Sequence, residues 1–313
     1  MQRRTLLKTL AVAPAAAITG QVATHDPDGH GRGPALSPIL TTEADWQSVA
    51  HALGRTGTLN SGTVYRVGFP RRDLAVTSYG IHVAAGLSLG SYAAFASYRD
   101  GKAMAMGDLV VTETELPAVT DALHAHEIDQ TAIHKHLLAH DPDLWWTHFH
   151  AVGKAVNIAQ GVRVALDYTT TPPPAPPTPP RPIDLDTAGI DAALGTVGKN
   201  DGGIYKFTFA LIETIVVHGR VAPPSMGVTT ALNFQPIGDQ KAAINGDFAM
   251  TTDEVQDVIV ALRAGGIQIV ELHNHSLDDR PRLFYMHFWA VADGVSLAQT
   301  LAQAVHATRV RPA

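Results

Sequence analysis

Two stretches of the chain resemble each other and decide the fold: residues 128–150 read IDQTAIHKHLLAHDPDLWWTHFH, and residues 267–289 read IQIVELHNHSLDDRPRLFYMHFW. Each contains a His-x-His motif, a proline and a further histidine at the same spacing. The offset between them is 139 residues, and it holds without a gap from Phe95 and Phe234 onward. Similarity at a fixed offset indicates a duplicated structural unit.

Working outward, the duplication covers most of the chain. The two copies extend over residues 43–167 and 184–308, and residues 168–183 separate them. This separator contains the run TTTPPPAPPTPPRP, so we expect an extended proline-rich linker. A length of 313 residues fits two domains, and 45% hydrophobic residues suffice for packed cores.

The N-terminal residues have the pattern of an export signal. Residues 1–23 combine Arg3 and Arg4 with a mostly apolar run that is too short to span a membrane, which predicts the twin-arginine route. Residues 24–42 are rich in glycine and proline and are expected to form a flexible spacer. The protein is therefore predicted to be exported to the periplasm, the cell envelope or the extracellular space, with no membrane span after signal removal.

Composition excludes several classes of protein. A formal net charge of -6 argues against a nucleic-acid partner, which requires a basic face. The absence of cysteine excludes disulfide scaffolds, thiolate zinc sites, iron–sulfur clusters and cysteine nucleophiles. Histidine is abundant instead, with 16 residues against 7 lysines.

Each copy has the same pattern of secondary structure. Alternating and β-branched residues predict strands at 63–68 and 103–110, and apolar residues at helical spacing predict a helix within 112–124. A hairpin and a final amphipathic helix follow in each copy; the hairpins pair residues 130–138 with 144–151 and residues 267–277 with 283–291. We therefore predict an α+β fold, in which two tandem copies of an antiparallel sheet each have helices packed on one face.

The hairpin of the second copy places its histidines on one face. Glu271, His273 and His275 project to the same side because side chains alternate along a strand. If residues 278–282 form a five-residue turn, His273 lies directly opposite His287. Three imidazoles on one face suit a divalent transition metal, with zinc, copper or manganese as candidates.

The first copy contains the same trio: His134, His136 and His148. It adds His140 in the turn and His150 on the face of His148. Because duplication copies residues, the second trio is not fully independent support for a metal, although all three histidines are kept while Glu271 is matched by Ala132 and Met286 by Thr147. The alternative is that these histidines are hydrogen-bonded residues of a sheet.

Other candidate residues lie near the hairpins. Glu271 is the candidate catalytic residue, as a general base or a fourth metal ligand. Asp108 and Asp247 each follow a glycine, and they are either turn residues or carboxylates beside the hairpin site. The sequence has no Gly-x-Ser-x-Gly motif, no P-loop and no dinucleotide-binding fingerprint.

Four motifs of the second copy are distinctive: MGVTTALNFQP at 226–236, KAAINGDF at 241–248, ELHNH at 271–275 and PRLFYMHFW at 281–289. These motifs resemble the LppY/LpqO-type family of exported bacterial proteins, which is otherwise labelled a domain of unknown function. The resemblance implies export and a shared fold for both copies, and it implies no activity. The first copy departs from the pattern, since His134-Lys-His136 replaces His-Asn-His.

Two classes of function are compatible with these observations. The first is an exported metal-dependent hydrolase or lyase that acts on a small molecule or on an envelope substrate, with a metal-bound water at an open position. The alternative is a non-catalytic binding or structural module whose histidines are hydrogen-bonded sheet residues. The sequence sets neither the substrate nor the oligomeric state.

Overall fold

The computed structural model describes residues 34–176 and 181–313. The predicted export signal, residues 1–23, lies outside the described residues, as does the first part of the predicted spacer. Within the described part of the chain, no helix is both long and apolar enough to cross a membrane. Residues 34–313 form one compact unit.

The first repeat consists of an antiparallel six-stranded sheet with helices on one face, in the strand order β1-β2-β5-β6-β9-β7. A small sheet, β4-β3-β8, lies at its end. The strands are β1 Thr58–Asn60, β2 Val64–Pro70, β3 Val76–Ser78, β4 Ile81–Val83, β5 Gly90–Ser97, β6 Ala103–Thr112, β7 Asp129–His134, β8 His140–Asp141 and β9 Leu144–Gly153. The helical elements are η1 Glu43–Trp46, α1 Gln47–Leu53, α2 Ala85–Ser88, α3 Leu116–Ala125 and α4 Ala155–Asp167.

The second repeat has the same architecture, with the strand order β10-β11-β14-β15-β17-β16 and β18 paired to β11. Its strands are β10 Lys199–Asp201, β11 Ile204–Leu211, β12 Val216–Val217, β13 Arg220–Val221, β14 Thr229–Pro236, β15 Lys241–Thr251, β16 Gln268–His273, β17 Leu283–Asp293 and β18 Val310–Pro312. Its helical elements are α5 Thr187–Leu194, η2 Pro224–Met226, α6 Val255–Ala264 and α7 Gly294–His306. The predicted α+β duplication is confirmed.

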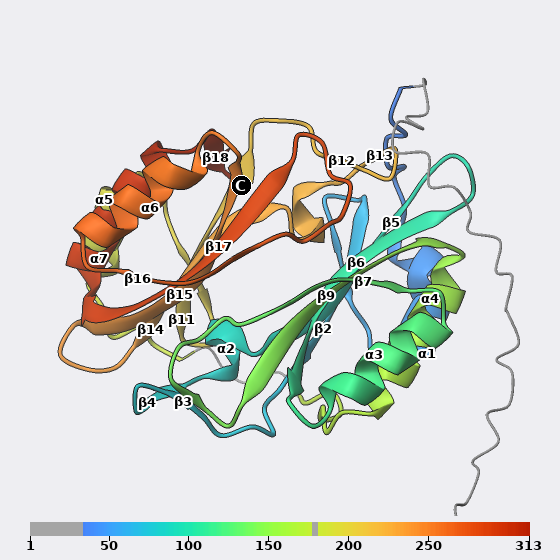
Figure 1. The fold of residues 1–313 in the computed structure, drawn as a ribbon, viewed down its shortest axis with the longest axis horizontal. Coiled ribbons are helices and arrows are strands. Elements are labelled where there is room, and N and C mark those ends of the chain that lie inside the picture. The colour runs from blue at the N-terminus through green and yellow to red at the C-terminus, as the bar shows by residue number, and fades with distance from the viewer. Residues whose placement is uncertain (1–33, 177–180) are drawn as a thin grey trace, which may run out of the picture. The chain divides into compact units, whose positions relative to one another are not determined.

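The two sheets lie next to each other in the middle of the unit, and the helices cover their outer sides (Figure 1). Helices α1, α3 and α4 cover the first sheet, and helices α5, α6 and α7 cover the second (Figure 1). Both faces of the central strands are consequently buried: all but three of the ten residues of β9 are buried. The sheet face opposite the long helices in each repeat is the face that meets the other repeat, and the short elements α2 and η2 lie on that side.

Four hydrophobic clusters follow from this layering. Two of them lie between a sheet and its own helices; Phe149 belongs to the first and Phe288 to the second. The other two combine residues of both repeats. One contains Met104 and Tyr285, and the other contains Trp146 and Trp289. The repeats are thus joined by apolar packing, which leaves a polar region between the two shared clusters.

The predicted register of the second hairpin is wrong by two residues. Glu271, not His273, pairs with His287, while His273 pairs with Tyr285. The hairpin connection is longer than predicted because side chains form hydrogen bonds with the backbone carbonyl and amide of Leu283. The side-chain amide of Asn274 donates to the Leu283 carbonyl at 2.6 Å, and Asp279 accepts from its amide at 2.9 Å. A shift of two residues keeps the same face, so the histidines still point inward.

The segments predicted to be a spacer and a linker are partly bound to the repeats. Leu36 bridges to Arg220, and Ile39 donates to the Ser97 carbonyl at 2.9 Å. In the linker, Pro172 and Pro173 accept hydrogen bonds from arginines of the first repeat. The described parts of both segments therefore lie against the protein surface.

A buried arginine connects the first repeat to the linker. Arg71 is fully buried and binds Asp73 at 2.9 Å and Glu115 at 2.8 Å. It also donates to Thr170 of the linker at 2.9 Å. These bonds neutralise a charge that would be costly to bury alone.

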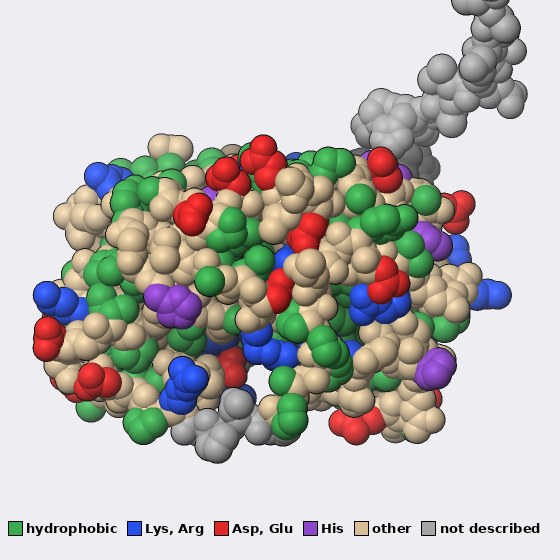
Figure 2. Space-filling view, turned by 90° about the horizontal axis from the view of Figure 1, so that it is seen from below, with side chains coloured by type: hydrophobic (Ala, Val, Ile, Leu, Met, Phe, Trp, Pro, Cys, Tyr) green, Lys and Arg blue, Asp and Glu red, His purple; other side chains and the backbone are tan. Residues whose placement is uncertain are grey.

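One face of the molecule is hollowed near its middle, and Lys and Arg side chains lie around the hollow (Figure 2).

Candidate metal centre

All six predicted histidines meet in one cluster between the two sheets. The rings of His134 and His273 are stacked 3.9 Å apart, centroid to centroid. On either side of this pair the distances repeat: His134 lies 4.7 Å from His148, and His273 lies 4.8 Å from His287. The cluster therefore has an approximate twofold symmetry, with the His134–His273 pair at its centre. We call it the six-histidine cluster.

Crosswise contacts join the two trios. The ring centroid of His136 lies 3.8 Å from that of His287, and that of His148 lies 3.8 Å from that of His275. The His134 and His136 Nε2 atoms are 2.9 Å apart. Each predicted trio is thus interleaved with the other instead of forming a separate site on its own hairpin.

The central strands orient two of the rings. The Nδ1 atoms of His148 and His287 lie 3.2 Å and 2.8 Å from the carbonyls of Gly107 and Gly246, respectively. A carbonyl only accepts, so Nδ1 carries the proton and Nε2 keeps its lone pair. This is the arrangement of metal-binding histidines, which usually donate their other ring nitrogen to a carbonyl or carboxylate.

Glycine is required at these two positions. An added Cβ at Gly107 would overlap the Phe149 ring and the Tyr92 carbonyl, and one at Gly246 would overlap the Phe288 ring. The closely packed aromatic rings hold strands β9 and β17 at the distance that places their histidines.

Two carboxylates complete the cluster. Asp108 Oδ2 lies 3.4 Å from His136 Nε2, and Asp247 Oδ2 lies 3.1 Å from His275 Nε2. Both aspartates sit in the middle of long strands, opposite His148 and His287. Of the two sequence-based interpretations, the structure therefore has carboxylates beside the site and not turn residues. Burial, with a contribution from the nearby Asp247, raises the pKa of Asp108 to about 8.

Several ring nitrogens of the cluster make no hydrogen bond with any described residue. They are His134 Nδ1, His148 Nε2, His275 Nε2, His287 Nε2 and both ring nitrogens of His273. Of these, His275 Nε2 has Asp247 Oδ2 at 3.1 Å. Burial first, and neighbouring imidazoles second, lower the pKa well below the ordinary imidazole value for His134, His136, His148 and His273. These four rings are therefore neutral at neutral pH, the form that coordinates metals.

Three sets of potential ligand atoms occur in the cluster, each set lying within 4.8 Å: His134 with His136 and His287, His134 with His148 and His273, and Asp247 with His273 and His287. Every set that contains first-repeat residues also contains a second-repeat histidine. The sets share members, so they describe alternative coordination around one centre and not three separate sites.

Glu271, the predicted catalytic residue, does not belong to these sets. Its Oε2 accepts a hydrogen bond from the Lys135 backbone amide at 2.7 Å. Thr131 likewise donates to the His275 carbonyl at 2.8 Å, and Asn245 donates to the His136 carbonyl at 2.7 Å. These bonds between the repeats fix the segments that carry the His-x-His motifs. Glu271 holds the backbone of the first-repeat motif in place.

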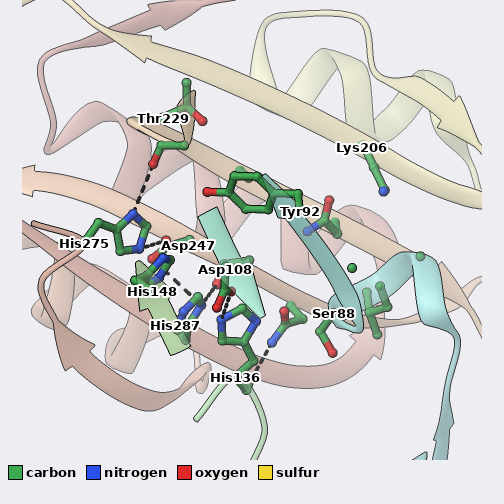
Figure 3. Close-up of a pocket in the computed structure, with 18 of the residues that line it drawn as sticks. Ser88, Tyr92, Asp108, His136, His148, Lys206, Thr229, Asp247, His275 and His287 are labelled. Atoms are coloured by element: carbon green, nitrogen blue, oxygen red, sulfur yellow. Dashed lines mark hydrogen bonds and ion pairs between the residues drawn. The ribbon is translucent and has the colours of Figure 1, made fainter. Parts of the chain in front are cut away.

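A pocket of about 240 Å³ opens onto the cluster. Figure 3 shows four histidines and both aspartates at one end, with Tyr92 and Lys206 lying away from them. The Arg66 guanidinium lies over the Tyr92 ring, 3.4 Å from its centroid, and donates to the Ser225 carbonyl at 3.0 Å. The pocket is therefore lined by ring nitrogens and carboxylates at one end and by cationic side chains elsewhere.

Sequence reasoning missed Arg66, Tyr92 and Lys206 as pocket residues. Arg66 and Lys206 occupy matching positions in the aligned copies, and this repeated positive charge was the available signal. Tyr92 carried no such signal, because alanine occupies its matching position, Ala231.

One protein-family model matches both repeats. A model described as Domain of Unknown Function (DUF1259) matches residues 47–168 and 188–307. The chain belongs to the DUF1259 family. It contains two DUF1259 repeats, at residues 47–168 and 188–307. The comparison identifies DUF1259 and not LppY/LpqO-type proteins, so the family resemblance drawn from the motifs is corrected.

No curated protein matches the chain significantly. Among solved structures, EtuB from Clostridium kluyveri aligns with a TM-score of 0.24 and 12% identity, covering 80% of this chain and 89% of EtuB. The trimeric bacterial microcompartment shell protein PduB aligns with a TM-score of 0.19 and 11% identity, covering 78% and 86%. The double-ringed trimeric shell protein MSM0271 from the RMM microcompartment aligns with a TM-score of 0.18 and 9% identity, covering 66% and 82%.

These comparisons correct the predicted function and location. Two of the three structures are described as shell proteins, and none is described as an exported protein, a hydrolase or a lyase. The comparisons thus support neither an exported metal-dependent hydrolase or lyase nor an exported location, and these two predictions are not retained. The low TM-scores do not extend a shell function to the DUF1259 repeats.

Proposed function

We propose that this chain is a binding module whose two DUF1259 repeats together hold one divalent transition-metal ion. This proposal takes up the non-catalytic alternative from the sequence, with one change. The histidines of the cluster are only partly hydrogen-bonded, so they do more than stabilise a sheet.

The observation that carries the proposal is the set of unpartnered ring nitrogens. Six nitrogens from five histidines are buried in the cluster without a hydrogen bond to any described residue. An unsatisfied buried polar group costs about 1–3 kcal/mol, so such a concentration is unfavourable in a purely structural role. A metal ion would satisfy several of these nitrogens at once.

The donor set fits a borderline transition metal. Neutral imidazoles with one or two carboxylates suit zinc and its neighbours in the first transition row, and the absence of thiolates disfavours purely soft-metal sites. His148 and His287 have the proton on Nδ1, which leaves Nε2 for the metal. Asp247 offers an oxygen within reach of His273 and His287.

The pocket indicates which kind of ligand reaches the centre. Arg66 and Lys206 line it, although Lys206 is also paired with Asp201 at 2.7 Å. A bound divalent ion would add positive charge at the inner end. A small anion, such as a carboxylate, therefore fits the pocket better than a neutral or cationic molecule does.

Metal analysis of protein purified without a histidine tag tests the proposal. Zinc-treated protein should retain an ion that His134→Ala and His273→Ala each remove, because the centre draws on both repeats. His124→Ala serves as the matched control, since His124 is exposed on α3. Metal content that is unaffected by either cluster substitution would overturn the proposal.

A further inference from the structure

A second group of potential metal ligands lies outside the six-histidine cluster. Asp129, His150 and His218 each present a ligand atom, and these atoms lie within 4.8 Å of one another. Asp129 is the first residue of β7, and His150 lies on β9 of the first repeat. His218 lies between β12 and β13 of the second repeat. The group therefore bridges the two repeats and shares no residue with the cluster.

His150 is the buried member of this group. It is 2% exposed, and its Nε2 makes no hydrogen bond with any described residue. Its ring lies 4.3 Å from that of His218, centroid to centroid. This buried nitrogen of His150 is therefore available as a metal ligand.

The matching positions in the two repeats show that duplication does not explain this group. At the offset of 139, Asp129 and His150 correspond to Gln268 and Trp289. His218 corresponds to Tyr79, because His218 lies between β12 and β13 and Tyr79 lies between β3 and β4. There, the Tyr79 hydroxyl donates to Gln268 Oε1 at 2.9 Å. The backbone is conserved in shape, since Tyr79 has φ 49° and His218 has φ 47°.

At Tyr79, Gln268 and Trp289 the side chains form a neutral hydrogen bond and place an indole ring beside it. At the matching positions His150, His218 and Asp129 provide two imidazoles and a carboxylate instead. The difference lies in the chemistry of the side chains and not in the path of the chain.

A further carboxylate orients His218. Asp278 Oδ2 lies 3.3 Å from His218 Nδ1, and its Oδ1 accepts from the His218 backbone amide at 3.1 Å. A carboxylate that binds one ring nitrogen leaves the other for a metal, the usual outer-shell arrangement of metal-binding histidines. The charge of the neighbouring Arg220 is offset by an ion pair with Asp100.

We propose that Asp129, His150 and His218 form a second divalent transition-metal site, which binds zinc between the two repeats. Two imidazoles and one carboxylate are three protein ligands, so one tetrahedral position remains for water or an exogenous ligand. Because Asp129 and His218 are exposed, this site exchanges its ion with solvent more readily than the six-histidine cluster.

Zinc titration of the double variant Asp129→Gln/His218→Tyr tests the site, because the substitutions copy Gln268 and Tyr79. Both positions are exposed, so the fold should be retained. Calorimetry of the metal-free wild-type protein should show a zinc-binding event at this site. In the double variant the Kd of that event should be raised more than about 100-fold, which is more than the loss of an outer-shell partner causes. Asp278→Asn should raise the same Kd by about 10–100-fold.

The cluster provides an internal comparison. His134→Ala should retain the binding event that the double variant loses, so failure at one site is distinguishable from failure at the other. Equal zinc stoichiometry and affinity in the wild-type protein and the double variant would overturn the proposal. Loss of the event in His134→Ala alone would also overturn it, because the ion would then belong to the cluster.

Discussion

His273→Leu separates a metal-binding role of the cluster from a structural one. Both ring nitrogens of His273 are buried without a hydrogen bond, and its ring is stacked between those of His134 and His287. Leucine has a comparable size and no polar atom. The substitution therefore removes two unsatisfied polar atoms together with one ring at the centre of the cluster.

The expected change in the free energy of unfolding of the metal-free His273→Leu variant has two opposing parts. Removing two unpartnered nitrogens relieves about 1–3 kcal/mol each. Fitting a branched side chain between packed rings costs about 1–3 kcal/mol. The free energy of unfolding of the metal-free protein should consequently stay within about 1 kcal/mol of the wild-type value or rise above it.

Zinc should make the wild-type protein more stable than the His273→Leu variant. With free zinc at about 1,000 times its Kd, the wild-type protein gains about 4.1 kcal/mol, whereas a variant with Kd raised a thousandfold gains only about 0.4 kcal/mol. Urea unfolding with EDTA and with buffered zinc measures both quantities. The Asp129→Gln/His218→Tyr background removes any contribution of the second site. A loss of 3 kcal/mol or more in EDTA, with zinc stabilisation intact, would refute the reasoning.

Further predictions concern the buried ion pairs and the pocket. Arg71→Met leaves the carboxylates of Asp73 and Glu115 unpaired, so urea unfolding at pH 7 should show a loss of about 3–5 kcal/mol, whereas the exposed Arg72→Met should change stability by no more than about 0.5 kcal/mol. Burial alone would raise the pKa of both carboxyls, but the bonds from Arg71 lower each pKa overall. Their stabilisation is therefore complete above about pH 5 and declines as the pH falls through the lowered values; an acid limb unchanged in Arg71→Met would contradict this. Arg66→Ala should weaken oxalate binding to the zinc-loaded protein about tenfold by calorimetry, and unchanged affinity would exclude the anion pocket.

The sequence identified the repeats and the histidines for a physical reason. Backbone geometry alternates side chains along a strand, so His-x-His places both rings on one face whatever the strand pairs with. The same alternation made the two-residue error in register harmless, since His273 and His287 still face inward. Helix positions were predictable too: α7 carries its apolar residues at helical spacing.

The sequence also led to an error in register, because side chains near the turn bind the backbone of the returning strand. Asn274 and Asp279 lengthen the hairpin connection by binding the backbone of Leu283, and no local pattern announces such bonds. Glu271 is predicted to be a base because it shares a face with His273, and this role stays a prediction. The structure adds that its carboxylate accepts a hydrogen bond from the backbone amide of Lys135 in the other repeat.

The sequence by itself therefore determined the duplication, the α+β architecture of each repeat and the six histidines that face inward. Only the tertiary structure decided that the two trios form a single cluster, with Asp108 and Asp247 beside it and a pocket leading to it. The physical reason is that each sheet has one face covered by its own helices and must bury the other against its twin. Packing the two bare faces together brings His134 against His273, a contact that depends on the docking of the sheets and not on any spacing within the chain.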